Sequence, residues 1–237
     1  MILDIYKDAF EFSSKKISSL FVLGVFSFFG FLIFPLIFFY GYNYNVVKLS
    51  TESMINGDDV PPDFTDYKTM FINGLKYFLV NFVYLIIPII IIILSLNSGN
   101  TSIAIGGVIL GIILLVLTTL FAFIAIPHMA SNEDSLKSAF DVSKLHEIIS
   151  SIGYGRYFIT YVGIALISLA IFIVVILILL ILFAILGIAV VAVSPSSFQT
   201  IGAFGLLLSN FILGFIVSPY LSIFTNRCMG LMYSLRS

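Results

Sequence analysis

Residues 157–193 read YFITYVGIALISLAIFIVVILILLILFAILGIAVVAV, and this stretch decides the class of fold. It contains no charged side chain and would measure about 55 Å as one straight helix, whereas the hydrocarbon core of a bilayer is about 30 Å thick. It also lacks the alternation of apolar and polar residues that is typical of a membrane β-strand. Because every backbone polar group inside a membrane must be paired within the protein, the stretch predicts transmembrane helix.

The composition of the whole chain agrees with a membrane protein. Of its 237 residues, 60% are hydrophobic and 10% are charged, and the mean hydropathy is +1.17. Soluble domains carry roughly 45–50% apolar and about 25% charged residues. The composition therefore excludes an ordinary soluble enzyme and a disordered regulator, and the single cysteine, Cys228, excludes a disulfide scaffold. With a net charge of −1, nucleic acid is not an expected partner.

The distribution of charged residues predicts the number of membrane crossings. No Asp, Glu, Lys or Arg occurs within 17–47, 77–132 or 157–226. One crossing needs about 20 residues, so these stretches fit one, two, and two or three crossings. We predict an all-α, polytopic transmembrane helical bundle of about five crossings, forming a single integral membrane domain over residues 1–237. The expected crossings are about 18–46, 77–96, 103–126, 157–186 and 203–226.

Two connections are expected to interrupt the apolar stretches. Asn97-Ser98-Gly99-Asn100 divides the second stretch, and the clearest break in the third is Ser194-Pro195-Ser196-Ser197. Tilting absorbs only part of the excess length of 157–193, so we also expect a break or an interfacial end near Gly187.

The basic residues predict the orientation. With five crossings, loops 48–76 and 127–156 and the C-terminus share one side, which holds eight of the eleven Lys and Arg residues. That side is expected to be the cytoplasm, and the chain is expected in the cell membrane. The N-terminus would then lie outside. A re-entrant first segment turning at Pro35 would instead bring all eleven basic residues inside. The spanning reading is preferred because segment 17–47 is generous for one crossing and short for a hairpin.

Three segments mix apolar and charged residues as interfacial amphipathic helices do. They are 2–12, 67–71 and 139–149.

Polar residues within the apolar stretches are few and uncharged, which argues against an ion-driven carrier. Gly214, Ser218, Ser222 and Asn226 recur every four residues and would share one helix face. Such a face favours close helix packing with interhelical hydrogen bonds. Together with Asn81 it could also line a path for a neutral solute. No motif of a nucleophilic or metal-dependent enzyme occurs, so we expect no catalytic, cofactor or metal site.

The densest polar patch lies in 52–66. Asn56-Gly57 suits a helix C-cap, because glycine adopts a positive φ without a Cβ clash. Pro61-Pro62 would stop the chain from re-entering a helix at once, and Asp63 or Thr65 could cap the next helix. Its five acidic residues could hold a divalent cation, but a solvated turn is the preferred interpretation because the ligand order of an EF-hand is absent.

Around this patch the chain resembles a known family. Gly41-Tyr42, Asn56-Gly57, the turn 61–66, Phe71 and Gly74-Leu75 follow the order of motifs in the DUF4013 family of archaeal and bacterial membrane proteins. The resemblance implies a five- or six-helix membrane architecture over most of the chain. It implies no activity, because the function of that family is unknown.

The sequence therefore predicts a non-enzymatic, multi-pass membrane protein that acts through lipid or protein contacts. Membrane lipids are the expected partners, together with a possible membrane-protein partner or a second copy of the chain. The alternative is a passive permease or export component for a neutral or lipid-like solute. The candidate structural or functional positions are Gly41, Tyr42, Gly57, Pro61, Asp63, Asp66, Gly74, Asn81, Ser218, Pro219, Ser222 and Asn226.

Overall fold

The structure is a computed structural model that describes residues 1–193 and 198–236. This part of the chain is helical and contains no strand, so the predicted all-α class is confirmed. The elements are α1 (Ile2–Ser14), α2 (Ile17–Phe28), α3 (Ile33–Glu52), α4 (Tyr67–Leu96), α5 (Thr101–Ala130), α6 (Leu136–Ala139), α7 (Val142–Ile152), α8 (Tyr154–Val193), α9 (Phe198–Ile212), the π-helical turn η2 (Leu213–Val217) and α10 (Ser218–Ser234). The break expected at 194–197 lies outside the described residues.

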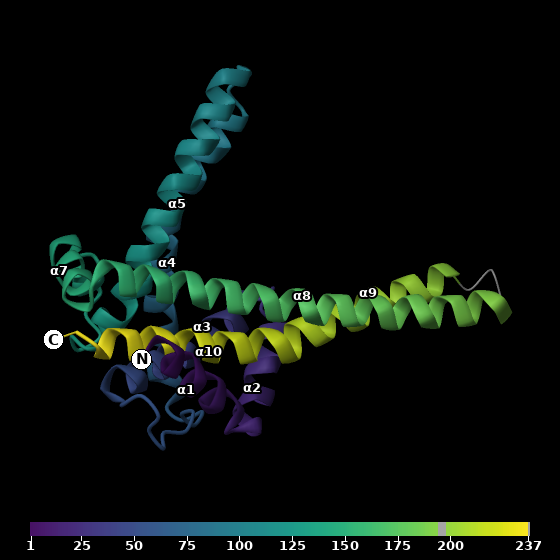
Figure 1. Cartoon of the computed structure of the whole chain (residues 1–237), viewed down its shortest axis with the longest axis horizontal. Helices are drawn as coiled ribbons and strands as arrows, with labels where there is room; N and C mark the ends of the chain where they lie inside the picture. Colours follow the sequence, from purple (N-terminus) through teal and green to yellow (C-terminus); the bar gives the residue numbers. More distant parts are fainter. Residues whose placement is uncertain (194–197, 237) are drawn as a thin grey trace.

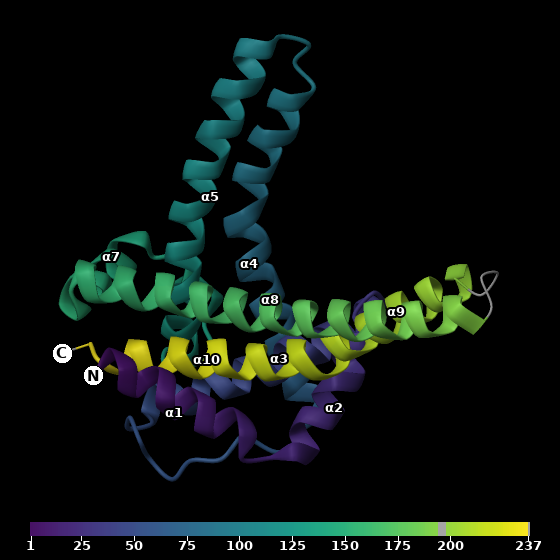
Figure 2. The same cartoon turned by 45° about the vertical axis from the view of Figure 1, so that its right-hand side comes forward.

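Two long helical hairpins project from a common base. Helices α4 and α5 pack against each other as one arm, and α8 packs against α9 as the other. Figures 1 and 2 show these two arms leaving the base in different directions. The base includes what we call the charged end, formed by α1, the loop 53–66, the segment 131–153 and the last turns of α10. Both chain termini lie there (Figure 1).

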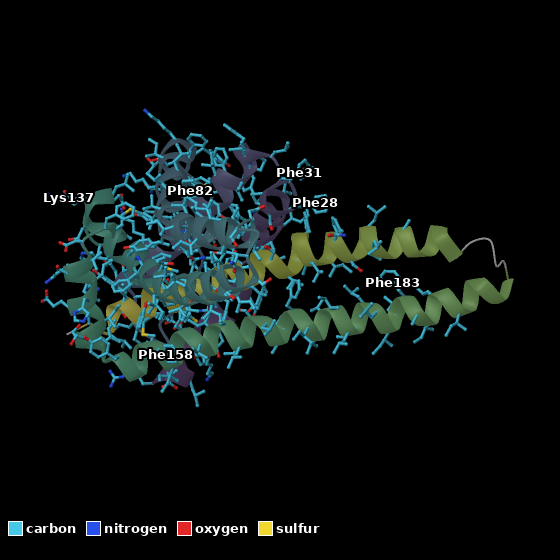
Figure 3. The ribbon with its side chains drawn as sticks, turned by 90° about the horizontal axis from the view of Figure 1, so that it is seen from above. Phe28, Phe31, Phe82, Lys137, Phe158 and Phe183 are labelled. Atoms are coloured by element: carbon cyan, nitrogen blue, oxygen red, sulfur yellow. The ribbon has the colours of Figure 1, made fainter. Side chains whose placement is uncertain are left out.

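Four helices are long and apolar enough to cross a membrane within the described part of the chain. They are Tyr67–Leu96, Thr101–Ala130, Tyr154–Ile188 and Gly202–Ser234. Large apolar side chains along the arms are exposed, among them Leu94 (66%), Ile181 (61%) and Leu207 (70%). Contiguous apolar surface of this extent is stable when lipid surrounds it. In Figure 3, Phe158 lies at the base of α8, and Phe183 lies between the two helices of its arm, where it packs against Gly205.

The segment expected to cross once at 18–46 has a different structure. It forms two helices, α2 and α3, joined by a turn at 29–32. Pro35 lies in the first turn of α3, where no N–H is needed. A helix continuing from α2 would place the Pro35 ring against the carbonyl of Phe31, so the helix ends before that point. The turn is strongly apolar and exposed, with Phe31 78% accessible, and Figure 3 shows Phe28 and Phe31 close to the α8–α9 arm.

Helix α8 passes through Gly187 without interruption, so the expected break there is wrong, while the alternative of an interfacial end stays a prediction. A single glycine lowers helix propensity, but ending the helix within lipid would leave backbone N–H and C=O groups unpaired. The second cost is larger, and no proline follows Gly187 closely enough to enforce a stop.

The amphipathic segments pack on protein as well as facing outward. In α1, Ile5, Ala9 and Phe12 are buried, and the helix lies against α10 (Figure 2). In α7, the apolar face packs on α5 and α8. Residues 67–71 form the first turn of α4 and are not a separate helix.

The helix before Pro219 changes its hydrogen-bond register. Proline has no N–H to give to the carbonyl of Phe215, four residues earlier. Residues Leu213–Val217 adopt a π-helical turn, in which a carbonyl pairs with the N–H five residues later. Gly24 of α2 lies directly against the Phe215 carbonyl, and a Cβ at that position would overlap it. The proline therefore shapes the contact between α2 and the η2–α10 rod.

Candidate functional site

A buried arginine organises the base of the molecule. Arg227 of α10 is fully buried, and its Nε donates to Oδ1 of Asp8 in α1 at 2.7 Å. Its Nη2 donates to Oδ2 of Asp59 at 3.0 Å, and its Nη1 donates to Oγ of Ser53 at 2.9 Å. The Phe12 ring lies 4.4 Å from the guanidinium carbon. One cation thus joins two carboxylates from parts of the chain that are far apart in sequence.

The same cluster holds the loop 53–66 in place. Asp8 Oδ2 accepts the backbone N–H of Asn56 at 2.6 Å, and Lys15 Nζ donates to the carbonyl of Asp59 at 2.9 Å. Burial raises the pKa of Asp59, but hydrogen bonds from Ser53 and Arg227 and the charges of Arg227 and Lys15 outweigh it, so the pKa lies below its usual value. The loop is therefore anchored by groups that keep this carboxylate ionised.

A second cluster surrounds Asp134, just after α5. Its carboxylate accepts from Lys48 Nζ at 2.8 and 3.0 Å and from the Tyr44 hydroxyl at 2.6 Å. Lys76 Nζ donates to its backbone carbonyl at 2.9 Å. Burial raises the pKa of Asp134, but the hydrogen bonds from Lys48 and Tyr44 and the two lysine charges lower it further than burial raises it. Glu133 and Asp134 have φ angles of 53° and 58°, so the contacts hold an unfavourable left-handed turn.

A polar pocket of about 400 Å³ lies between the ends of α5 and α10 and the outer face of α7. His128 of α5 is 6% exposed, and its Nδ1 lies 2.8 Å from the Tyr233 hydroxyl and 3.1 Å from Asn132 Nδ2. Arg236 stacks on the Tyr233 ring, with its guanidinium carbon 3.7 Å from the ring centre. Lys144 enters the lining from α7. We call this the His128 pocket.

Two apolar grooves of about 360 Å³ each flank α8. The α5–α7–α8 groove has walls that include Leu117, Phe121 and Phe158, and its rim holds a 2.9 Å hydrogen bond between His146 and Tyr154. The other groove lies between α2, α8 and η2 and is lined by apolar side chains and Tyr220. Both have the apolar lining that suits an acyl chain.

The predicted positions around Gly41 form the contact between α3 and α4. A Cβ on Gly41 would overlap the carbonyl of Met70, and one on Gly74 would overlap the carbonyl of Ile37. The two glycines therefore let the helix backbones meet. The side chain of Tyr42 is buried, and its hydroxyl donates to the carbonyl of Pro62 at 3.1 Å.

The loop 53–66 differs from the expected capping pattern. Asn56 takes the positive φ of 61°, and Gly57 does not, although its N–H closes the turn on Met54 at 3.1 Å. Asp66, not Asp63 or Thr65, caps α4 by accepting the Thr69 N–H at 3.2 Å.

The remaining loop positions have structural contacts. Asp63 forms an ion pair with Lys16 at the start of α2, and Pro61 is buried. Phe64 stacks on Tyr42 with ring centres 4.3 Å apart. With Asp59 bound to Arg227 and Asp63 bound to Lys16, two of the acidic groups that could have held a cation already have basic partners.

The polar side chains predicted as candidate positions in the crossings form hydrogen bonds within the protein. Ser27 Oγ donates to Ser218 Oγ at 2.9 Å, and Ser222 Oγ donates to the carbonyl of Pro219 at 2.9 Å. Asn226 is buried and accepts the Tyr77 hydroxyl at 3.0 Å. The amide of Asn81 donates to the carbonyl of Tyr77 at 3.0 Å. None of these predicted positions lines the pocket or the grooves described above.

Sequence reasoning missed the ionic clusters and the His128 pocket. Asp8 carries a local signal, because helical spacing puts it on the face of α1 that contains Ile5 and Phe12. Arg227 likewise lies between Phe224 and Cys228, which are both buried. No sequence pattern near Asp8 or Arg227 indicates that the two side chains pair with each other, because they lie 219 residues apart.

An all-α chain with four membrane-length apolar helices and an ionic base is an integral, multi-pass membrane protein. Residues 28–181 match the family described as "Protein of unknown function (DUF4013)", and the chain belongs to that family. No curated protein and no solved structure matches it. The matched region contains the Gly41–Gly74 helix contact and the Asp134 cluster, and it ends within α8.

Proposed function

We propose that this protein is a non-enzymatic membrane protein that acts through contacts with lipids. The observation that carries the proposal is the α5–α7–α8 groove. Its apolar walls lie at the foot of the α4–α5 arm, and its polar rim, His146 with Tyr154, lies at the charged end. An acyl chain with its headgroup at the rim matches this division between apolar and polar surface.

The proposal includes an orientation in the cell membrane. The charged end faces the cytoplasm, and segment 17–47 enters and leaves the membrane on that side. Three contacts support this: α1 packs on α10 through Asp8 and Arg227, Lys16 pairs with Asp63, and Lys48 pairs with Asp134. Both ends of the segment thus lie at the charged end, and all eleven Lys and Arg residues can lie on one side, as the positive-inside rule favours.

The permease alternative stays a prediction. Its lining residues, such as Ser218 and Asn226, form hydrogen bonds with other protein groups. We therefore carry the lipid-contact proposal forward.

Retention of a brominated lipid tests the groove. The chain has no tryptophan, so a single introduced tryptophan is an unambiguous fluorescent probe. Phe158→Trp places it in the groove wall, and Leu180→Trp places it on the exposed surface of the α8–α9 arm as the matched control. Each purified variant is loaded with brominated phosphatidylcholine in detergent and then washed with lipid-free detergent.

We expect the Phe158→Trp probe to stay quenched after washing and the Leu180→Trp probe to recover. A groove that holds a lipid releases it slowly, whereas lipid on an exposed arm exchanges with detergent. Equal and full recovery of both probes would overturn the proposal.

A further inference from the structure

The lining of the His128 pocket fixes which ring nitrogen of His128 carries the proton. Asn132 Nδ2 donates to the backbone carbonyl of His128 at 2.7 Å, and a carbonyl can only accept. The atom near His128 is therefore the amide nitrogen and not the amide oxygen. The same nitrogen lies 3.1 Å from His128 Nδ1, so Nδ1 is the acceptor. In the neutral ring the proton is then on Nε2, which becomes a donor.

The Tyr233 hydroxyl is compatible with this assignment. It lies 2.8 Å from the same Nδ1, and a hydroxyl can donate to a ring nitrogen that carries no proton. Tyr233 is 2% exposed, so the bond is shielded from water. Within the described residues, His128 Nε2 has no hydrogen-bond partner in the protein. A nearly buried imidazole N–H is thus available to a ligand of the pocket.

Cationic groups dominate the pocket. Arg236 is held by its stacking on Tyr233 and by a 3.1 Å hydrogen bond from Nη1 to the Tyr233 carbonyl. A guanidinium has five N–H donors, and most of them have no partner among the described residues; their planar fork matches phosphate oxygens. Lys144 adds a second cation. Its partner, Glu147, lies 2.8 Å away, and both side chains are about half or more exposed, with accessibilities of 49% and 68%. Such an exposed pair is weak and can be replaced by an anionic ligand.

The pocket lies at the boundary between the apolar part of α5 and the charged end. Residues up to Pro127 belong to the apolar stretch of α5, and His128 follows at once. The pocket therefore lies where the apolar sequence of α5 ends and the charged end begins, and a headgroup phosphate lies at such a boundary between apolar and polar surface. Hydroxyl groups such as that of Ser151 also line it. Donors outnumber acceptors, and the charged side chains sum to a positive value.

We propose that the His128 pocket binds a phosphate group, and that its physiological source is the headgroup of an anionic phospholipid. Arg236 and Lys144 neutralise the phosphate, and His128 Nε2–H donates to one of its oxygens. The choice of a lipid source rests on the proposed function. The phosphate site itself rests only on the pocket.

Binding of short-chain lipids to the full-length protein in detergent tests this proposal. The probes are dihexanoyl phosphatidic acid, dihexanoyl phosphatidylcholine and inorganic phosphate, with dissociation constants measured by calorimetry. We expect the phosphatidic acid to bind more tightly than the phosphatidylcholine. We expect Arg236→Gln to weaken binding of phosphatidic acid about tenfold or more, because a charge-assisted bond is lost.

Lys137→Gln is the matched control. It removes the same charge from the neighbouring α6. Lys137 is exposed and does not line the His128 pocket, and Figure 3 shows it near the segment of α6 and α7. The Lys137→Gln variant should bind phosphatidic acid with the same affinity as the unmodified chain. Glu147→Gln is the opposite test, since it releases Lys144 and removes a negative charge. We expect it to strengthen binding several-fold, a gain that a misfolded variant could not produce.

The binding results distinguish a lipid headgroup from free phosphate as the source of the bound phosphate group. Binding of phosphatidic acid without binding of inorganic phosphate supports a lipid headgroup. Equal binding of both supports the phosphate site and overturns its lipid source. If Arg236→Gln and Lys137→Gln bind alike, or if Glu147→Gln brings no gain, the site is overturned. Loss of bromolipid retention in the α5–α7–α8 groove, with phosphate binding intact, would instead reject the proposed function and leave this pocket standing.

Discussion

Arg227 and Asp8 lie 219 residues apart in the chain, yet their side chains meet at 2.7 Å with 1% and 3% of their surfaces accessible. This contact joins the first helix to the last. Neither group reaches water. Asp8 is compensated by Arg227 and by the backbone N–H of Asn56, whereas Arg227 is also bound to Asp59 and Ser53.

Removing one partner of this pair should destabilise the protein strongly. We expect Arg227→Met or Asp8→Leu to lower the free energy of unfolding by about 3–5 kcal/mol. The first leaves the buried Asp8 without a cation, and the second leaves the buried Arg227 with the partly exposed Asp59 as its remaining carboxylate partner. The double variant should recover a large part of that loss. Thermal unfolding in detergent, followed by circular dichroism, measures the change.

Lys7→Met serves as the control for that comparison. Lys7 is on the same helix, and its contact with Glu11 at 3.8 Å is exposed, so its loss should cost at most about 1 kcal/mol. An Asp8→Leu chain as stable as the Lys7→Met chain would contradict a structural role for the buried pair.

The charged end should lose stability in acid. Asp59 and Asp134 both have a pKa below the usual value in the folded protein. Their contribution is fully present above the unfolded pKa of about 3.9 and is lost as the pH falls through the lower folded pKa. We expect unfolding temperatures in detergent to stay level from neutral pH to about pH 5 and to fall below about pH 4.

Asp134→Asn should flatten this acid dependence and lower the stability at neutral pH. Asp58→Asn is the matched control, because Asp58 is exposed and next to Asp59 in the loop. Equal acid profiles for the unmodified chain and Asp134→Asn would show that Asp134 does not drive the transition.

Cysteine labelling in intact cells should place the N-terminus on the same side as the C-terminus. The native Cys228 is buried, so it should contribute little background. We expect Glu11→Cys and Lys137→Cys to be protected from an impermeant maleimide, and Asn100→Cys, at the tip of the α4–α5 arm, to react. If Glu11→Cys reacted as Asn100→Cys does, segment 17–47 would cross the membrane once.

The contact between α3 and α4 should not accept a side chain at Gly74. A Cβ there overlaps the backbone of α3, so we expect Gly74→Ala to lower the free energy of unfolding by about 1–3 kcal/mol. Gly106→Ala is the control, because a Cβ at Gly106 of α5 meets no atom within 4 Å. It should be neutral or slightly stabilising. Equal unfolding temperatures for both variants would mean that the helices have room to separate.

The arms could be predicted because their signal is local. The charge-free stretch 77–132 and the polar residues at 97–100 predict two helices and a turn. The structure has α4 and α5 there, and the Asn100 side chain caps α5 by accepting the Ser102 N–H at 2.9 Å. Apolar length and cap chemistry need no knowledge of distant residues.

The base could not be predicted for the opposite reason. From the sequence alone, Arg227 is interpreted as a basic residue at the end of a membrane crossing. Its burial follows only from the position of α1 beside α10. The His128 pocket likewise needs the ends of α5, α7 and α10 to be brought together. At Pro35 the sequence left both a single crossing and a re-entrant turn open. Only the observed α2–α3 turn shows that the helix ends before the proline.

The divergence of the two arms has a mechanical consequence for the surrounding bilayer. Where both arms cross a bilayer, their tips lie farther apart than the points at which the arms leave the base (Figure 1). Each inserted molecule therefore displaces unequal numbers of lipids from the two leaflets. A flat membrane must stretch or compress one monolayer to accommodate that wedge, whereas a membrane curved toward the charged end already provides the unequal areas.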